Sequence, residues 1–243
     1  MSNTNTNSIT PKVGVPPFKG VVKRVRASGY DFFKAFGDLI DNAVGRSENI
    51  IITLIEDPET KLLNCIYISD DCEQGFENIT KNGSDNPFNL AHMRVGHSDD
   101  AETSEFGTGM KTAAVSCGNL FKVVSRVDNE DGINYWCVEM DFPEMMSRSI
   151  PEESYQPRFI PYTEHLYHQE HKYFEKGSTI KLSHLTSLAS IRLDDDYDGY
   201  GVEKYKVSYL EAIKNYIAIT YGENIDKNEI NIKLGVNDSE LEK

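Results

Sequence analysis

The sequence has few cysteines, and they lack the spacing that would give them a shared function. Among 243 residues there are four, namely Cys65, Cys72, Cys117 and Cys137. None of them forms a C-x-x-C pair, so neither a zinc ribbon nor a thioredoxin-like motif is indicated. We expect thiols that are buried or in loops, in a reducing compartment.

Long hydrophobic runs are also missing. No apolar stretch approaches the roughly 20 residues that a membrane-spanning helix needs. The N-terminus, MSNTNTNSITPK, is polar and has no apolar signal-peptide core. Hydrophobic residues make up 39% of the chain and charged residues 26%, which is ordinary for a globular protein. We expect a soluble intracellular protein, cytoplasmic or nuclear, with no membrane partner.

Positive charge is scarce outside the N-terminus. The formal net charge is −14. Residues 1–36 contain six basic side chains and one acidic side chain, so the rest of the chain carries −19. Such an acidic body repels phosphate backbones and is a poor general binder of nucleic acid. The basic N-terminal segment could contact a polyanion or an acidic partner, or it could be a solvated, flexible arm.

Composition divides the chain into a short arm and one domain. Residues 1–16 are rich in Asn, Thr, Ser and Pro, which predicts a disordered arm. Residues 17–243 are predicted to form the domain, as the N-terminal part of a longer protein. Within it, the polar and irregular residues 76–106 are typical of a functional or mobile loop. Residues 147–175 are rich in Pro, Tyr, His and Glu and are predicted to be an insertion.

Apolar periodicity predicts helices and strands in a mixed order. Apolar residues at three- and four-residue spacing indicate a helix over 30–44, ending near Gly45, and another over 202–221. β-branched stretches at 49–56 and 62–69 predict a hairpin. The remaining predicted elements are a helix over 107–117 and strands over 120–127, 133–141, 178–185 and 230–234. We therefore predict an α/β two-layer sandwich, with helices on one face of a mixed, largely antiparallel sheet.

Asp38 and Asn42 lie four residues apart on the predicted helix over 30–44. This spacing places both side chains on one face, about 6 Å apart along the axis. The Asn oxygen is a ligand suited to Mg²⁺. The carboxylate can orient and deprotonate a water for attack on a phosphoryl group. Taken alone, the pair could also be an ordinary exposed polar stripe.

Asp70 follows a predicted strand, and its carboxylate could accept a hydrogen bond from the exocyclic amine of adenine. Guanine presents a carbonyl at that position and would be refused, because a buried unpaired acceptor is costly. Gly75 would let the backbone approach the base closely. Ser178, at the start of a late strand, could bridge to Asp70 through a water. Without the other motifs, an ordinary acidic turn after a strand would explain the same residues.

A glycine-rich box, Gly107-Thr108-Gly109-Met110-Lys111, opens the predicted helix over 107–117. Glycines there free backbone N–H groups to face phosphate, and the helix N-terminus adds a favourable partial charge. Lys111 could pair with a terminal phosphate. The box is neither a Walker A loop nor a dinucleotide-binding G-x-G-x-x-G, so it carries little information alone.

The order and spacing of these boxes resemble those of the GHKL superfamily, which comprises gyrase, heat-shock chaperone, histidine kinase and MutL ATPases with the Bergerat fold. The resemblance covers roughly residues 28–240. Ser28-Gly29-Tyr30 and the segment 105–113 look most like MORC-type ATPases and related prokaryotic or viral ATP-binding proteins. The resemblance implies a Bergerat fold, ATP and Mg²⁺ as cofactors, and a mobile lid at 76–106.

The resemblance also implies a role for each matching residue. Asp38 would be the general base, and Asn42 would hold Mg²⁺. Asp70 would read adenine, with Ser178 assisting through a water and Gly75 under the base. The residues that would hold the phosphates are Gly107, Thr108, Gly109, Met110 and Lys111.

Three departures from the family pattern bear on activity. The base is usually Glu, and Asp38 is one methylene shorter, which can slow hydrolysis. The adenine box usually reads D-x-G-x-G, whereas Cys72 replaces the first Gly here and one extra residue precedes Gly75. Many members complete the site with a Lys from a following transducer domain, and this chain ends about where that domain would begin.

Two functions fit this reading of the sequence. The first is Mg-dependent ATP binding with slow hydrolysis, coupled to lid closure and homodimerisation, driving a DNA-associated clamp of the MORC, topoisomerase or MutL kind. The second is an ATP-binding switch with little or no hydrolysis that acts through protein partners. A histidine-kinase function is disfavoured, because no phospho-acceptor helix precedes the boxes.

Two further motifs have weaker interpretations. His165, His168 and His171 follow H-x-x-H-x-x-H, but three-residue spacing drifts around a helix axis, which favours a solvated insertion over a metal site. Residues 194–199 resemble the opening of an EF-hand calcium loop, but the twelfth position is Tyr205 rather than Glu. An acidic loop that stabilises the N-terminus of the following helix explains them better.

Overall fold

The computed structural model describes residues 16–28, 30–76, 78–79, 86–88, 109–129, 132–197 and 207–237. The helices are α1 (Phe18–Ala27), α2 (Phe32–Ile40), α3 (Gly109–Cys117), α4 (Phe142–Ser147), the 3-10 helix η2 (Glu153–Tyr155), α5 (Glu164–Glu170) and α6 (Tyr209–Asp226). The strands are β1 (Asn49–Glu56), β2 (Leu63–Asp70), β3 (Gly118–Asn129), β4 (Gly132–Asp141), β5 (Arg158–Tyr162), β6 (Ser178–Leu185), β7 (Asp196–Tyr197), β8 (Val207–Ser208) and β9 (Asn231–Val236).

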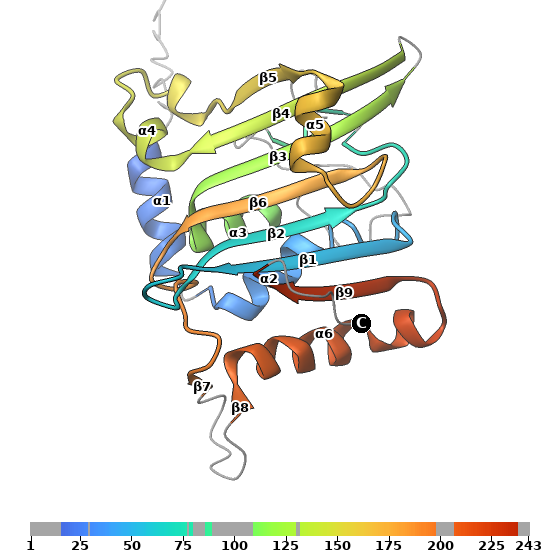
Figure 1. Ribbon diagram of the computed structural model, residues 1–243. Helices are drawn as coiled ribbons and strands as arrows, with labels where there is room; N and C mark the ends of the chain where they lie inside the picture. Colours follow the sequence, from blue (N-terminus) through green and yellow to red (C-terminus); the bar gives the residue numbers. More distant parts are fainter. Residues whose placement is uncertain are drawn as a thin grey trace, which may run out of the picture.

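Seven strands of the described residues form one twisted sheet in the order β5-β4-β3-β6-β2-β1-β9 (Figure 1). β1 and β9 run parallel, and the other neighbouring pairs in this sheet run antiparallel. The predicted mixed, largely antiparallel sheet is thus confirmed. β7 and β8 pair with each other in a separate two-stranded ribbon.

One face of the central strands is apolar and packs on the helices. The strand register aligns these side chains in rows, because successive residues of a strand point to opposite faces. One row joins Ile68, Ile180 and Val123, and the next joins Ile66, Leu182 and Phe121. All six are buried in the main core with residues of α2 and α3. Burial of each contributes about 1.5–3 kcal/mol, so this face holds the two layers together.

The second face of the sheet carries a smaller helix. α5 lies in front of β3, β4 and β5 in Figure 1, whereas α2 and α3 lie behind the sheet. Tyr167 of α5 is buried there against Val124 and Cys137, in a cluster separate from the main core. The two-layer sandwich therefore gains a partial third layer at one end of the sheet.

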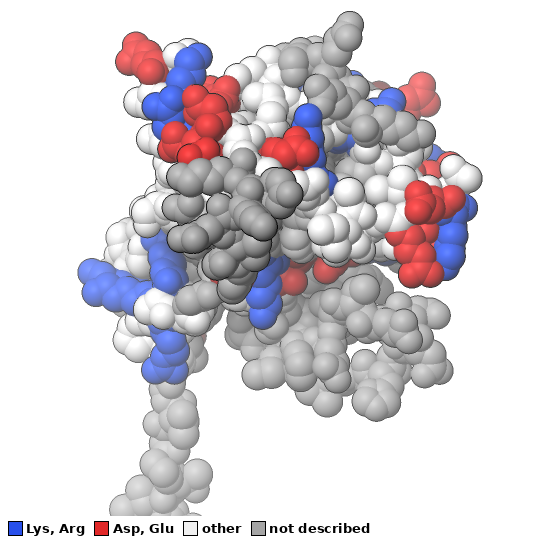
Figure 2. Space-filling model, turned by 90° about the horizontal axis from the view of Figure 1, so that it is seen from below, with Lys and Arg blue, Asp and Glu red and all other residues white. Residues whose placement is uncertain are grey.

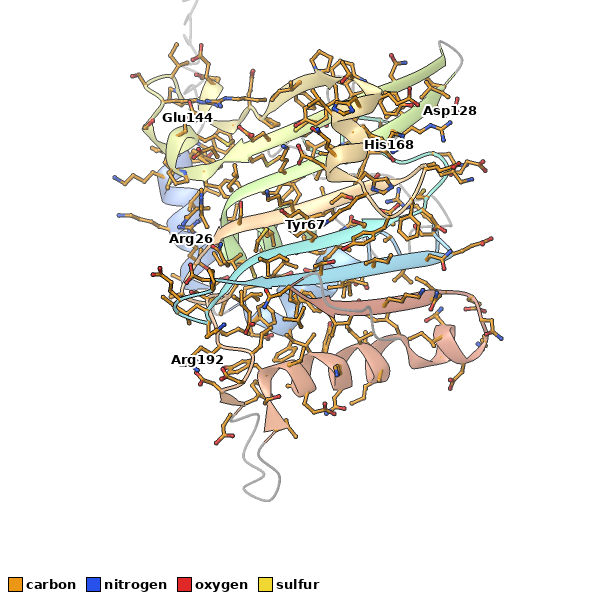
Figure 3. All side chains as sticks on the ribbon, viewed as in Figure 1. Arg26, Tyr67, Asp128, Glu144, His168 and Arg192 are labelled. Carbon is orange, nitrogen blue, oxygen red and sulfur yellow. The ribbon has the colours of Figure 1, made fainter. Side chains whose placement is uncertain are left out.

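The basic N-terminal segment is not a free arm over its whole length. Residues 18–27 form α1, which no periodicity signal had predicted. Phe18 and Val22, one turn apart, are buried in the main core. Arg26 donates hydrogen bonds to the carbonyl oxygens of Val115 (2.9 Å) and Gly118 (3.0 Å), at the end of α3 (Figure 3). The interpretation of this stretch as a solvated flexible segment is therefore wrong from residue 18 onward.

Two predicted helices have different bounds in the structure. The helix expected over 30–44 ends at Ile40. Residues 41–46 form a turn, within which Gly45 has φ +79°. The helix expected over 202–221 begins at Tyr209 and continues to Asp226. Its start follows Ser208, whose side chain accepts a hydrogen bond from the Glu211 backbone. This S-x-x-E capping signal is visible in the sequence and marks the start better than apolar spacing does.

The stretch predicted as an insertion, 147–175, contributes to the main sheet. It contains η2, β5 and α5, and β5 pairs with β4 as the edge strand. Most of the predicted lid, 76–106, lies outside the described residues, as do Gly107 and Thr108 of the glycine-rich box.

Two further observations concern the charged surface and the helix lengths of the described residues. Figure 2 shows Lys and Arg in small groups, separated by acidic and uncharged side chains, on the face that it presents. None of the described helices is long and apolar enough to cross a membrane.

Candidate functional site

α2 carries the predicted base toward the start of α3. The helix begins after Asp31, whose carboxylate accepts a hydrogen bond from the Lys34 backbone at 2.9 Å. Its apolar residues, including Phe36 and Leu39, are buried in the core. Asp38 lies on the side that faces α3, and a Cβ placed on Gly109 would be 3.3 Å from both Cγ and Oδ2 of Asp38. The Asp38–Asn42 motif and the glycine-rich box therefore meet in the structure.

Asn42 lies in the turn that follows α2, one turn beyond Asp38. Its side-chain nitrogen donates a hydrogen bond of 2.5 Å to the backbone carbonyl of Asp38. The side chain of Asn42 therefore lies against the backbone of Asp38 beyond the end of the regular helix, and the shared face predicted from the four-residue separation stays a prediction. The bond uses the amide nitrogen, and the amide oxygen is the atom that a hard cation would take.

Burial, together with the nearby charge of Asp41, raises the pKa of Asp38 to about 6. Asp41 is itself held by Tyr221 of α6, whose hydroxyl donates to Oδ1 of Asp41 at 2.7 Å. A carboxylate with a pKa nearer neutrality is a better proton acceptor than an ordinary one. The surroundings of Asp38 are thus compatible with general-base chemistry.

Asp70 ends β2 on the core face of the sheet and is only 6% exposed. Its Oδ1 accepts hydrogen bonds from the Cys72 backbone at 3.0 Å and from the Ser47 hydroxyl at 3.4 Å. The backbone N–H of Ser178, its register partner on β6, also lowers the pKa of the carboxyl group. Burial nevertheless raises the pKa of Asp70 to about 6, and these hydrogen bonds oppose that rise.

The structure explains why residue 75 is a glycine, which the sequence alone did not. Its φ is +56°, and a Cβ there would lie 2.1 Å from the carbonyl oxygen of Arg126 and 2.5 Å from Oγ of Ser125. Glycine is therefore required so that the loop can pack against the β3 backbone. The extra residue between Cys72 and Gly75 does not prevent this approach. The predicted place of Gly75 under a base remains a prediction.

Ser125 is a buried residue of the site with several hydrogen-bond partners, and it was not predicted from the sequence. Its hydroxyl accepts a hydrogen bond from the Phe76 backbone at 2.9 Å and lies 3.0 Å from the hydroxyl of Ser178. Strand register places Asp70, Ser178 and Ser125 in one row across β2, β6 and β3. A serine at a core-facing position of a strand that otherwise presents Phe121, Val123 and Val127 was the signal that could have revealed it.

The described part of the glycine-rich box opens α3. Gly109 is the first residue of the helix, and Met110 and Lys111 follow within its first turn. Lys111 is 8% exposed. It lies in the first turn of α3, and the N-terminus of a helix favours negative charge.

The turn after α2 links the two halves of the site. Arg46 donates through Nε to the Asn42 carbonyl at 3.0 Å, and its charge lowers the pKa of Asp70. Ser47, the next residue, donates to Asp70. The Asp38–Asn42 side and the Asp70–Ser178 side are therefore joined by one short stretch of chain.

Comparison with known families agrees with this arrangement. The family model described as histidine kinase-, DNA gyrase B- and HSP90-like ATPase matches residues 30–172. The chain belongs to this family. Its Bergerat-type fold and its capacity for ATP binding follow from that membership. A comparison with curated proteins found no match.

The weaker motifs find structural explanations. His165 and His168 are exposed on α5, whereas His171 is fully buried and uses both ring nitrogens in hydrogen bonds with Thr179 and Lys176. In the acidic loop, Asp194 pairs with Arg192 at 3.0 Å. Residues 198–206 lie outside the described residues.

Proposed function

We propose that this domain binds ATP with Mg²⁺ between α2, the loop after β2 and the start of α3, and that it hydrolyses ATP slowly. The observation that carries the proposal is the position of Asp38 against Gly109, the first residue of α3. A helix N-terminus with a nearby lysine favours phosphate groups. A carboxylate beside it is placed to act on the water that attacks the terminal phosphate.

Each residue has a defined part in this proposal. Asp70 accepts a hydrogen bond from the adenine amine, and Lys111 pairs with phosphate oxygens. Asn42 provides a side-chain oxygen for Mg²⁺, which would neutralise phosphate charge when bound. Asp38 accepts a proton from water while the water oxygen bonds to the γ-phosphorus. The bond from that phosphorus to the β-phosphate oxygen breaks, releasing ADP and phosphate.

Substitutions at Asp38 test the hydrolytic half of the proposal. Asp38→Asn keeps the shape and removes the proton acceptor, so phosphate release should fall about 100-fold or more while ATP affinity changes little. Asp38→Glu restores the longer side chain usual for the family and should preserve or raise the rate. Phosphate release and nucleotide binding are measured on the same preparations. An Asp38→Asn protein that hydrolyses ATP as fast as the wild type would refute the assigned base.

The alternative is an ATP-binding switch with little hydrolysis that acts through protein partners. The specific feature that favours it is the shorter side chain of Asp38, because proton transfer depends strongly on distance. Tight ATP binding without phosphate release by the wild type, together with no gain in Asp38→Glu, would select this alternative.

The wider function is proposed from the MORC-like resemblance of the boxes. We infer that ATP binding closes the segment predicted as a lid at 76–106, promotes homodimerisation and drives a DNA-associated clamp. Light scattering after size-exclusion chromatography, with and without a non-hydrolysable ATP analogue, tests the dimer. A mass that stays monomeric at saturating analogue would contradict this part.

A further inference from the structure

The turn before β6 determines how Asp70 is held. Ser178, the first residue of β6, is the register partner of Asp70 on β2, and its backbone N–H lowers the pKa of the Asp70 carboxyl group. Gly177, immediately before it, has φ +112°, and a Cβ there would lie 1.9 Å from the Asp70 carbonyl oxygen. The turn is therefore packed directly on the backbone of Asp70. A displacement of residues 176–178 would therefore shift the backbone of Asp70 and of its register partner Ser178.

Two side chains from the α5 region anchor this turn from the opposite face of the sheet. The Tyr167 hydroxyl donates to the Gly177 carbonyl at 3.1 Å, and Nε2 of His171 is 2.8 Å from the Lys176 carbonyl. Both side chains are fully buried. α5 itself is visible on this face in Figure 3, where His168 labels it. The stretch predicted as an insertion thus supplies two fixed contacts behind the candidate adenine subsite.

The hydrogen bonds of His171 have one consistent direction. A carbonyl can only accept, so Nε2 carries the proton toward Lys176. Nδ1 then accepts from the Thr179 hydroxyl at 2.8 Å, and the Thr179 oxygen accepts from the Ser69 hydroxyl at 2.8 Å. Burial lowers the pKa of His171 to about 4, which keeps this neutral form at physiological pH.

This chain of bonds ends beside the candidate site. Ser69 precedes Asp70 on β2, Thr179 follows Ser178 on β6, and the two are register partners. Their side chains point to the face away from the core, because their neighbours Asp70 and Ser178 point toward it. Hydrogen bonds of Ser69 and Thr179 on the opposite face of the sheet therefore hold the backbone next to Asp70 and Ser178.

We propose that Tyr167 and His171 are positioning residues that hold the Lys176–Ser178 turn and thereby aim the Asp70 carboxylate at adenine. This inference rests on the proposed nucleotide site. Neither residue would touch the nucleotide, since both lie on the other face of the sheet. Their loss should loosen base recognition and leave the chemistry at Asp38 unchanged.

The test uses two substitutions that remove one hydroxyl each and keep the side-chain shape, Tyr167→Phe and Thr179→Val. ATP and GTP dissociation constants are measured by calorimetry, with urea unfolding to confirm the folded state. We expect the ATP dissociation constant to rise about five- to tenfold, which corresponds to loss of one hydrogen bond. The GTP constant should change less, so that selectivity for ATP falls, and turnover at saturating ATP should stay unchanged.

His165→Ala is the matched control, because His165 is exposed on the same helix, and it should leave both constants unchanged. Selectivity equal to wild type in both hydroxyl-deletion variants would overturn the positioning role, as would an equal loss of ATP and GTP affinity. Failure of the wild type to bind ATP would instead refute the proposed function itself.

Discussion

At the scale of single residues, Asp70 combines deep burial with a partly compensated charge. Two donors hold its carboxylate, namely the backbone N–H of Cys72 and the hydroxyl of Ser47. The backbone N–H of Ser178 also favours the ionised form of Asp70. Its pKa still rises to about 6, because burial penalises the ionised form more than these hydrogen bonds stabilise it. Ionised Asp70 therefore costs folding stability above pH 6, and the proposed binding of adenine would explain why a carboxylate is present at this buried position.

The raised pKa of Asp70 predicts a pH-dependent ATP affinity. Below about pH 6 the group is protonated before nucleotide binds and loses the charge that makes it a strong acceptor for the adenine amine. The ATP dissociation constant should therefore rise by up to about tenfold per pH unit below 6 and be flat above it. Calorimetric titrations between pH 5 and 8 measure this. Inorganic triphosphate, which lacks adenine, is the control for protonation of the phosphates, and an identical profile for both ligands would contradict the prediction.

At the scale of elements, the turn before β6 depends on the absence of a side chain at residue 177. We predict that Gly177→Ala lowers the free energy of unfolding by about 3 kcal/mol or more, because both the positive φ and the clash with the Asp70 backbone oppose a Cβ. Gly132 is a matched control with φ +104° and nothing within 4 Å of its Cβ position. Gly132→Ala should cost about 1 kcal/mol. Urea unfolding of both variants measures the difference, and equal costs would show that the close approach is unimportant.

Arg26 of α1 caps the C-terminal end of α3. Arg26 contacts the carbonyl oxygens of Val115 and Gly118 and the side-chain oxygen of Asn119. Arg26→Met should lower the free energy of unfolding by about 1–2 kcal/mol, because carbonyl groups at the end of α3 lose their donor. Arg24→Met, an exposed position on the same helix, should stay within about 0.5 kcal/mol of wild type. Equal effects in chemical denaturation would argue against the cap.

At the scale of the whole molecule, buried titratable groups predict how stability responds to acid. The folded-state pKa of His171 is about 4, below its ordinary 6.5, so the unfolded chain binds the extra proton between these values. His171 therefore contributes stability that is complete above pH 6.5 and is lost as pH falls to 4, up to about 3 kcal/mol. Asp38 and Asp70 act in the opposite direction, because their raised pKa values make acidification from pH 6 stabilising.

This balance can be measured by comparing wild type with His171→Gln from pH 4 to 7.5. The free energy of unfolding of the variant, relative to wild type, should rise as pH falls below 6.5, because the variant no longer takes up a proton on unfolding at this site. A constant difference between the two proteins across the range would contradict the assignment. His165→Gln, at an exposed histidine on α5 that does not contribute to the shifted pKa of His171, is the control and should follow the wild-type curve.

Much of the sheet and the order of the site boxes could be predicted from sequence. The strands over 49–56 and 178–185 agree with β1 and β6 residue for residue. Their apolar and β-branched runs are local signals that need no knowledge of the fold. The helix that carries Asp38 was likewise predicted from local periodicity, whereas Asn42 lies in the turn after its end. Helix bounds were less accurate where a turn or a cap, rather than apolar spacing, ends the element.

The features of the fold and site that could not be predicted depend on contacts between distant parts of the chain. Sequence alone determined the short boxes, the strand pattern and the acidic body, since each is a property of neighbouring residues. Only the tertiary structure brought Asp38 to Gly109, seated Gly75 on β3, buried Ser125 and turned the stretch 147–175 into a brace for residues 176–178. These features join residues that are mostly tens of positions apart, and their energies exist only once the sheet has closed around them.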